Sequence, residues 1–134
     1  MKGHARQFMT SKVALATPQM TLADAARELS RLEISGLPVV DTDGQVLGIV
    51  TESDLLDALL AETSVETRVH TVMTSPVVTV DEFTPADVVA RLLRTHRVHH
   101  LPVMRQGSVV GIITPQEIIR YFVTNELPVP PEVA

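Results

Sequence analysis

The sequence predicts a mixed α/β fold of the α+β class, in which a β-α-β-β-α unit occurs twice. The stretch Gly48–Asp54 recurs in altered form as Gly111–Glu117, 63 residues later. In both copies a glycine opens a short apolar, β-branched run, and a threonine stands where that run gives way to a helical pattern. Shortly before it, Leu37–Val39 is matched by Leu101–Val103. The chain is therefore a duplicated unit.

Each copy is expected to open with a short strand and to continue with a helix. The strands are predicted at Val13–Ala16 and Val77–Val80, each after a Met-Thr-Ser sequence. The helices are predicted to begin after Thr21 and Thr84, because an acid follows each threonine three residues later, as in a capping box. Both helices carry apolar residues at helical spacing, so each has one apolar face that needs a sheet to cover.

The remaining strands and helices follow in the same order in both copies. In each copy a strand entered through Leu-Pro leads into a hairpin turn and then into a second strand. The turns are predicted at Asp41–Gly44 and Arg105–Ser108. A closing helix is expected after each threonine of the repeated motif. The predicted division is residues 1–61 for the first repeat with its lead-in, 62–70 for a polar linker, 71–124 for the second repeat and 125–134 for an extended proline-rich tail.

Composition narrows the function classes. The chain has 134 residues, 45% of them hydrophobic and 3% aromatic, and a formal net charge of −5. A negative charge and few aromatic side chains argue against nucleic-acid binding. The absence of cysteine excludes disulfides, thiolate catalysis and cysteine-based metal centres. No apolar run reaches the length of a signal peptide or membrane helix, so we expect a soluble cytoplasmic protein without a membrane partner.

The ordered set of motifs, present in duplicate from Met9 to about Phe122, resembles a tandem pair of CBS domains, or Bateman module. The shared features are the M-T-S opening, a helix, an L-P-V strand, a hairpin, G-h-h-T-x-x-D and a final helix. The resemblance implies two repeats packed in pseudo-twofold fashion through their sheets, and frequent pairing of modules into a disc-shaped dimer. It also implies clefts for AMP, ADP, ATP or S-adenosylmethionine, and regulation, such as energy sensing, without catalysis or a catalytic cofactor. The regulated protein is unknown.

In the family, each cleft takes the threonine and acid at a helix start from one repeat, and the first strand and the loop before L-P-V from the other. The main cleft, here called the Thr51 cleft, is then expected to contain Ile49, Thr51, Asp54, Val77, Val78, Thr79, His99 and His100. A second and weaker cleft, here called the Thr114 cleft, would contain Val13, Ala14, Ser35, Gly36, Thr114 and Glu117. The resemblance assigns the threonine to the phosphate or ribose and the aspartate to the ribose hydroxyls.

The alternative for each threonine–acid pair is a capping box that binds nothing. Thr21 and Thr84 have the same spacing at helices where no ligand is expected, so spacing alone favours this alternative. The second copy has Glu117 in place of aspartate, and Pro115 removes one N–H from the helix start. We therefore expect one good adenosyl site in the Thr51 cleft and one degenerate site.

The basic run from Arg94 to His100 has no counterpart in the first repeat. His99 and His100 resemble the His-Arg pair that precedes L-P-V in the gamma subunit of AMP-activated kinase, where those positions face phosphate. There are two alternatives to a phosphate-facing role for this basic run. One is a solvated basic helix end, and the other is a zinc site of His96, His99 and His100. The zinc site would need the helix to continue to His100, which the following Leu-Pro opposes.

Three function classes follow from these patterns. The leading one is a stand-alone sensor whose adenosyl ligand changes the geometry or stability of a homodimer. The second is a ligand-independent protein–protein interaction module with filled clefts. An enzyme is third, because the sequence holds no nucleophile elbow, phosphate loop or convincing metal constellation.

Overall fold

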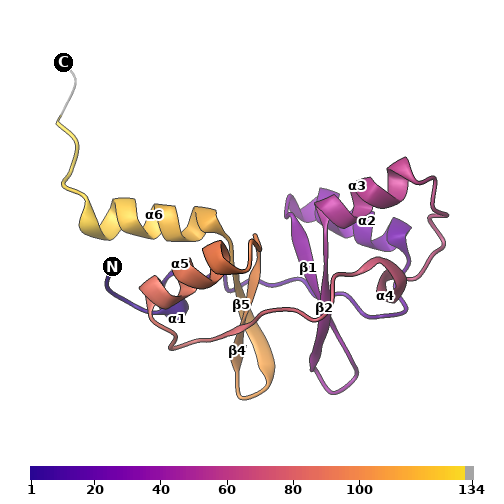
Figure 1. Ribbon diagram of the computed structural model, residues 1–134, viewed down its shortest axis with the longest axis horizontal. Coiled ribbons are helices and arrows are strands. Elements are labelled where there is room, and N and C mark those ends of the chain that lie inside the picture. The colour runs from indigo at the N-terminus through magenta and orange to yellow at the C-terminus, as the bar shows by residue number, and fades with distance from the viewer. Residues whose placement is uncertain (132–134) are drawn as a thin grey trace.

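The computed structural model describes residues 1–131, and the last part of the predicted tail, residues 132–134, lies outside the described residues. Two similar halves lie side by side (Figure 1). The first repeat contains α2 (Leu22–Leu32), β1 (Gly36–Val40), β2 (Val46–Thr51) and α3 (Glu52–Leu60). The second contains β3 (Val80–Asp81), α5 (Ala86–Thr95), β4 (Leu101–Arg105), β5 (Ser108–Ile113) and α6 (Pro115–Glu126). These elements confirm the predicted mixed α/β class.

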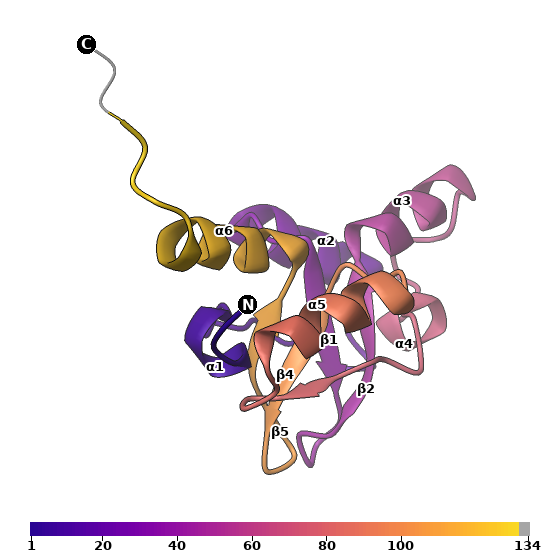
Figure 2. The same cartoon turned by 60° about the vertical axis from the view of Figure 1, so that its left-hand side comes forward.

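The central hairpins of the two repeats have matching geometry. β1 pairs with β2 and β4 pairs with β5, both antiparallel, and each pair has one register shift, after Val39 and after Val103. Gly44 and Gly107 adopt φ angles of 81° and 83° in the hairpin turns, a conformation that glycine adopts without steric cost. In two views the helix pairs α2/α3 and α5/α6 lie on one side of the molecule and the hairpin turns on the other (Figures 1 and 2).

The predicted opening strands are mostly absent, and the path of the chain explains why. Thr10 pairs with Ile112 of β5 and Ala16 pairs with Val39 of β1, so residues 10–16 cross from the second repeat to the first. Residues 74–80 cross in the opposite sense, from Ile49 of β2 to the short strand β3 beside β4. Val13–Leu15 and Val77–Thr79 lie between these contacts and belong to no strand.

Two short helices were not predicted. They are α1 (Ala5–Phe8) and α4 (Val69–Val72). Val69 and His70, assigned to the linker by sequence, begin α4, and the side chain of Val69 is fully buried. Single helical turns of four residues carry too little periodicity to be recognised in a sequence.

The helix preceding each repeat completes the core of the other repeat. Ala5 and Phe8 of α1 pack in the core of the second repeat, whereas Val69 of α4 packs in that of the first. The backbone confirms the exchange, because Ala5 N–H donates to the Thr84 carbonyl at 2.9 Å and Val69 N–H donates to the Met20 carbonyl at 2.7 Å. The two repeats are thus interlocked, and the predicted boundary at residue 61 does not separate two cores.

One predicted helix cap is wrong. Thr21 caps α2, since its side chain accepts from the Asp24 N–H at 3.1 Å. Thr84 does not cap α5, because its hydroxyl oxygen accepts from the Asp81 N–H at 3.0 Å. The residue at the start of α5 is Pro85, which makes no side-chain cap. The turn formed by residues 81–84 uses the threonine that the capping-box spacing assigned to the helix.

No helix between residues 1 and 131 is long and apolar enough to cross a membrane.

Candidate functional site

The repeated glycine lets a crossing segment approach each central hairpin. A Cβ added at Gly48 would lie 2.7 Å from the carbonyl oxygen of Thr74, and one added at Gly111 would overlap the side chain of Met9. Contacts this close leave room only for hydrogen. The G-h-h-T motif therefore needs glycine at its first position, because the Met-Thr-Ser segment that precedes the other repeat lies against it.

At the start of α3, the carboxylate of Asp54 accepts hydrogen bonds from two threonines. Asp54 Oδ2 accepts from the backbone N–H of Thr51 at 2.8 Å and from its hydroxyl at 3.1 Å. Asp54 Oδ1 accepts from the hydroxyl of Thr74 at 3.1 Å. Thr51 in turn accepts from the Asp54 N–H at 3.3 Å, which completes a capping box. The crossing segment is thus tied to the helix start of the opposite repeat.

The start of α6 repeats this network with a glutamate. Glu117 Oε2 accepts from the Thr114 N–H at 2.7 Å and from the Thr114 hydroxyl, and Oε1 accepts from the Thr10 hydroxyl at 3.0 Å. Burial acts to raise the pKa of Glu117, but the hydrogen bonds from Thr114 and Thr10 outweigh it and hold the pKa below 4.5. Glu117 is therefore a carboxylate at neutral pH. The extra methylene does not remove it from the position that Asp54 occupies in the first repeat.

Both helix starts have few N–H groups left for phosphate. At α6, Pro115 has none, Gln116 N–H donates to the Thr114 hydroxyl oxygen at 3.3 Å, and Glu117 N–H donates to the Thr114 carbonyl at 3.1 Å. At α3, Glu52 N–H donates to the Ser35 carbonyl at 3.0 Å. The free N–H groups that make a helix start attractive to phosphate are thus largely used by the protein itself.

All six residues predicted for the Thr114 cleft line one cavity of about 490 Å³. They come from both repeats: Val13, Ala14, Ser35, Gly36, Thr114 and Glu117. The cavity is also lined by four ionisable residues that were not assigned to it, namely Lys12, Glu33, Glu52 and His100. Thr10 belongs to the lining too, and its Met-Thr-Ser motif was recognised in the sequence as a repeat marker but not as part of a site.

His100 lines the Thr114 cleft and not the Thr51 cleft, where its place before L-P-V predicts it. Its Nε2 lies 2.6 Å from the hydroxyl oxygen of Ser35, and a Cβ added at Gly36 would lie 3.0 Å from its ring. The pKa of His100 lies below 6.5, mainly because the side chain is buried and to a smaller extent because His99 is near. Glu52, Glu117 and Asp54 act to raise this pKa. The glycine at position 36 thus makes room for an imidazole that joins the two repeats.

Ile49, Val77, Val78 and Thr79, which were also assigned to the Thr51 cleft, have different surroundings. Ile49 is buried in β2, where it exchanges two backbone hydrogen bonds with Thr74, of 3.0 and 2.8 Å. Val77 and Thr79 line a cavity of about 390 Å³ near the hairpin turns, whose lining includes neither Thr51 nor Asp54. Val78 packs against the core of the second repeat.

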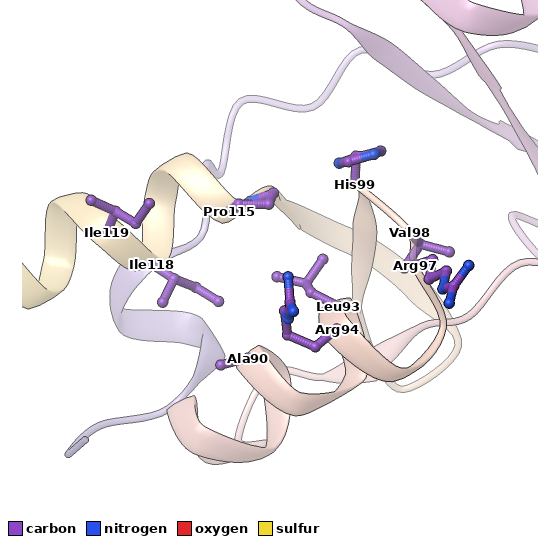
Figure 3. Close-up of a pocket in the computed structure, with 9 residues that line it drawn as sticks. All are labelled: Ala90, Leu93, Arg94, Arg97, Val98, His99, Pro115, Ile118 and Ile119. Carbon is purple, nitrogen blue, oxygen red and sulfur yellow. The ribbon is translucent and has the colours of Figure 1, made fainter.

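His99 faces a third cavity, of about 470 Å³, between α5 and α6. Figure 3 shows Ile118 of α6 and Leu93 and Arg94 of α5 pointing into the space between the two helices. α5 ends at Thr95, so His96, His99 and His100 do not lie on one helix. Among residues 1–131, no group of three or more histidine, aspartate or glutamate side chains could hold a metal ion, so the zinc alternative has no support there.

Comparison with known proteins identifies the family. The CBS domain matches the chain twice, at residues 5–61 and 69–124. A CBS domain-containing protein of Dictyostelium discoideum is 31% identical over 144 residues, which cover 98% of this chain and 99% of the relative. The inosine-5'-monophosphate dehydrogenase of Mycobacterium tuberculosis is 34% identical over 114 residues, but these cover 84% of this chain and only 21% of that enzyme.

Solved structures agree with this assignment. A CBS domain pair in complex with 5'-methylthioadenosine and S-adenosyl-L-methionine has a TM-score of 0.85 and 28% identity, over 94% of this chain and 100% of the other. CBSX2 in complex with AMP has a TM-score of 0.77 and 30% identity, over 91% and 97%. The duplicated hairpins, the crossing segments and these matches lead to one conclusion: the chain belongs to the CBS domain family and is a tandem CBS domain pair.

Proposed function

We propose that this chain is a non-catalytic regulatory module that binds an adenosyl ligand in the Thr114 cleft, and that the ligand changes the stability or geometry of a homodimer. The observation that carries the proposal is the cavity of about 490 Å³ built by both repeats around Thr114 and Glu117. The relatives that bind AMP, 5'-methylthioadenosine and S-adenosylmethionine support an adenosyl ligand.

Glu117 is the group that would hold the ribose. Each carboxylate oxygen has two lone pairs, and Oε1 accepts one hydrogen bond, from Thr10. A lone pair thus remains for a ribose hydroxyl, and a hydrogen bond to an ionised carboxylate is stronger than one between neutral groups. Val13, Ala14 and Ile112 offer apolar surface in the same cavity for the adenine ring.

The charges of the cavity select among adenosyl ligands. Glu33, Glu52 and Glu117 place three carboxylates in the lining, against one lysine, Lys12. The helix start offers few N–H groups to phosphate, as described above. Affinity should therefore follow the order S-adenosylmethionine, 5'-methylthioadenosine, AMP and ATP, because each step adds negative charge to the ligand.

This ranking of the clefts reverses the expectation from sequence. The sequence assigned both histidines to the Thr51 cleft, and His100 lies against Ser35 instead. We propose the Thr51 cleft, with Thr51 and Asp54, as the weaker adenosyl site. Because the walls of the Thr114 cleft come from both repeats, a ligand there bridges them. A ligand that prefers one arrangement of the repeats then shifts the population towards that arrangement.

Isothermal titration calorimetry with the four ligands tests the proposal. We expect saturable binding of S-adenosylmethionine, weaker binding of AMP and the weakest binding of ATP. Glu52→Gln serves as a charge probe, because it removes one carboxylate from the lining without touching the Thr114–Glu117 network. It should improve AMP binding relative to S-adenosylmethionine. Absence of binding by all four ligands would refute the adenosyl proposal.

The second candidate is a ligand-independent interaction module, which the exposed apolar side chains of α3 and α6 favour. Thermal unfolding separates the two candidates. A ligand at 100 times its dissociation constant stabilises the folded protein by about 2.7 kcal/mol. An interaction module would show no shift with any adenosyl ligand.

A further inference from the structure

A further cavity, of about 600 Å³ and here called the α1–α6 cavity, lies between α1 and α6. Residues 7–10 form one wall, and α6 forms the other with Glu117, Arg120, Tyr121, Thr124 and Asn125. α1 lies beside α6 in both views of the molecule (Figures 1 and 2). The α1–α6 cavity shares Thr10 and Glu117 with the Thr114 cleft and none of that cleft's other lining residues. It is therefore a separate space, and its volume is within the range of small-molecule sites.

Three contacts hold the N-terminal segment against the second repeat. The rings of Phe8 and Tyr121 pack with their centroids 5.2 Å apart. Thr10 exchanges two backbone hydrogen bonds with β5, both of 3.0 Å. At the far end of α6, the backbone N–H of Lys2 donates to the carboxylate of Glu126 at 3.3 Å. The cavity is thus formed by the fold itself, which lowers the entropic cost of binding a ligand there.

The duplication allows the walls of this cavity to be compared with the same positions of the first repeat. The wall before the repeat is similar in both copies, since a Met-Thr pair occurs at residues 9–10 and at residues 73–74. The wall from the last helix differs in length. α6 has 12 residues and α3 has 9, so the positions that match Thr124 and Asn125 lie beyond the end of α3. α6 thus presents side chains on a helix that is longer than its counterpart.

The charge of the helix wall also differs between the copies. Arg120 of α6 corresponds to Asp57 of α3, and Asn125 corresponds to Glu62. Where the first repeat has two acids, the second repeat has a base and an amide. The acids would repel an anion, whereas the base attracts one.

The charges of the N-terminal segment act in the same direction as Arg120. Residues 1–23 contain Lys2, Arg6 and Lys12 and no acid, although the whole chain has a formal net charge of −5. Arg120 itself is exposed, and within residues 1–131 it makes no ion pair. The protein is thus locally basic around this cavity while it is acidic as a whole, and a local positive potential favours an anionic ligand.

We propose that the α1–α6 cavity binds a small organic anion, a carboxylate or a phosphate monoester, with Arg120 as its charge partner. A guanidinium group presents several N–H donors in a planar arrangement that fits the oxygens of carboxylates and phosphates. The Thr124 hydroxyl and the second N–H of the Asn125 amide add neutral donors. The rings of Phe8 and Tyr121 offer apolar surface to the rest of the ligand.

Glu117 determines where in the cavity the anionic group lies. Its carboxylate repels another anion, even though both of its oxygens already accept hydrogen bonds. Asn125 lies eight residues further along α6, which is about 12 Å at 1.5 Å per residue. The anionic group therefore belongs near Arg120 and Asn125, at the end of the cavity away from Glu117.

Tyr121 makes a test specific to this cavity possible, because it is the only tyrosine and the chain has no tryptophan. Its fluorescence should change saturably on titration with glutarate or butyl phosphate, and not with glutaramide, the uncharged analogue of glutarate. Arg120→Gln should weaken the binding of both anions roughly tenfold. Asn125→Glu, which introduces the acid found in the first repeat, should weaken it as well. An equal response to glutaramide, or a change that rises linearly without saturation, would overturn the proposal.

Lys12→Gln is the matched control, because Lys12 lines the Thr114 cleft and not the α1–α6 cavity. It should leave the fluorescence titration unchanged, and urea unfolding shows that each variant is folded. Loss of the response in Lys12→Gln but not in Arg120→Gln would place the anion in the Thr114 cleft and overturn the proposal. The titration contains no adenosyl ligand, so its outcome is independent of the proposed function.

Discussion

The two helix starts of this protein share one hydrogen-bond network and differ in what surrounds it. At α3, Asp54 joins Thr51 to Thr74, and at α6, Glu117 joins Thr114 to Thr10. Beyond the network the two sites diverge. The Thr114 cleft gathers His100, Lys12 and two further glutamates, whereas four of the residues expected around Thr51, namely Val77, Thr79, His99 and His100, line three different cavities.

This comparison separates two roles of the same motif. The threonine–acid pair holds the crossing segment of the opposite repeat against the helix start, and it does so in both copies. Ligand specificity must then come from the residues around the network, which the duplication has not kept equal. The two helix starts should therefore differ in ligand binding while their networks contribute equally to stability.

The largest expected effect is on ligand binding. Glu117→Ala should weaken S-adenosylmethionine binding about 10- to 100-fold, because it removes a charged hydrogen-bond acceptor worth about 1.5–3 kcal/mol. Asp54→Ala is the matched control and should change the affinity less than about threefold. Calorimetry measures both, with urea unfolding to show that each variant is folded. A larger loss in Asp54→Ala would restore the ranking that the sequence suggested.

The glycines of the two motifs should differ in their effect on stability. Gly48→Ala should lower the free energy of unfolding by about 1–3 kcal/mol, because its Cβ meets the Thr74 carbonyl, a backbone atom that cannot move alone. Gly111→Ala should cost less, since its Cβ meets the side chain of Met9, which can change rotamer. Urea denaturation measures the two values. Equal losses would show that the backbone contact at Gly48 relaxes freely.

The two crossing segments should contribute equally. Thr10→Val and Thr74→Val each remove one hydroxyl that donates to a carboxylate, at 3.0 and 3.1 Å. Both hydrogen bonds are exposed to solvent, so each substitution should lower the free energy of unfolding by about 0.5–1.5 kcal/mol, less than is usual for a hydrogen bond to a charged group. A difference above about 1 kcal/mol between the variants would mean that the two networks are not equivalent.

The pH dependence gives the smallest effect, and its direction follows from the two groups of the Thr114 cleft. The pKa of His100 is held below 6.5, so the unfolded chain takes up the proton first and stability falls as the pH drops below about 6.5. His100→Gln should remove this loss. The pKa of Glu117 is also lowered, so its contribution is present above pH 4.5 and is lost as the pH falls through its value in the folded protein. Urea unfolding at several pH values measures both contributions. A stability profile of His100→Gln identical to that of the unmodified protein would contradict the contribution of His100.

The sequence predicted the duplicated architecture and the lining of one cleft because both depend on local patterns. Strand periodicity, hairpin turns and helix starts at Thr51 and Thr114 are all visible within a few residues. The crossing of residues 10–16 and 74–80, and the exchange of α1 and α4 between cores, depend on contacts between distant segments. For the same reason the sequence alone did not show that the ring of His100 turns towards Ser35. Gly36 was the one local signal, because a glycine there leaves room for a ring from the other repeat.

A crystal structure with S-adenosylmethionine tests the central claim most directly. The account predicts the adenosyl group in the Thr114 cleft, with the carboxylate of Glu117 at hydrogen-bond distance from a ribose hydroxyl and the ligand in contact with both repeats. A ligand found only beside Asp54, or none at a saturating concentration, would contradict it.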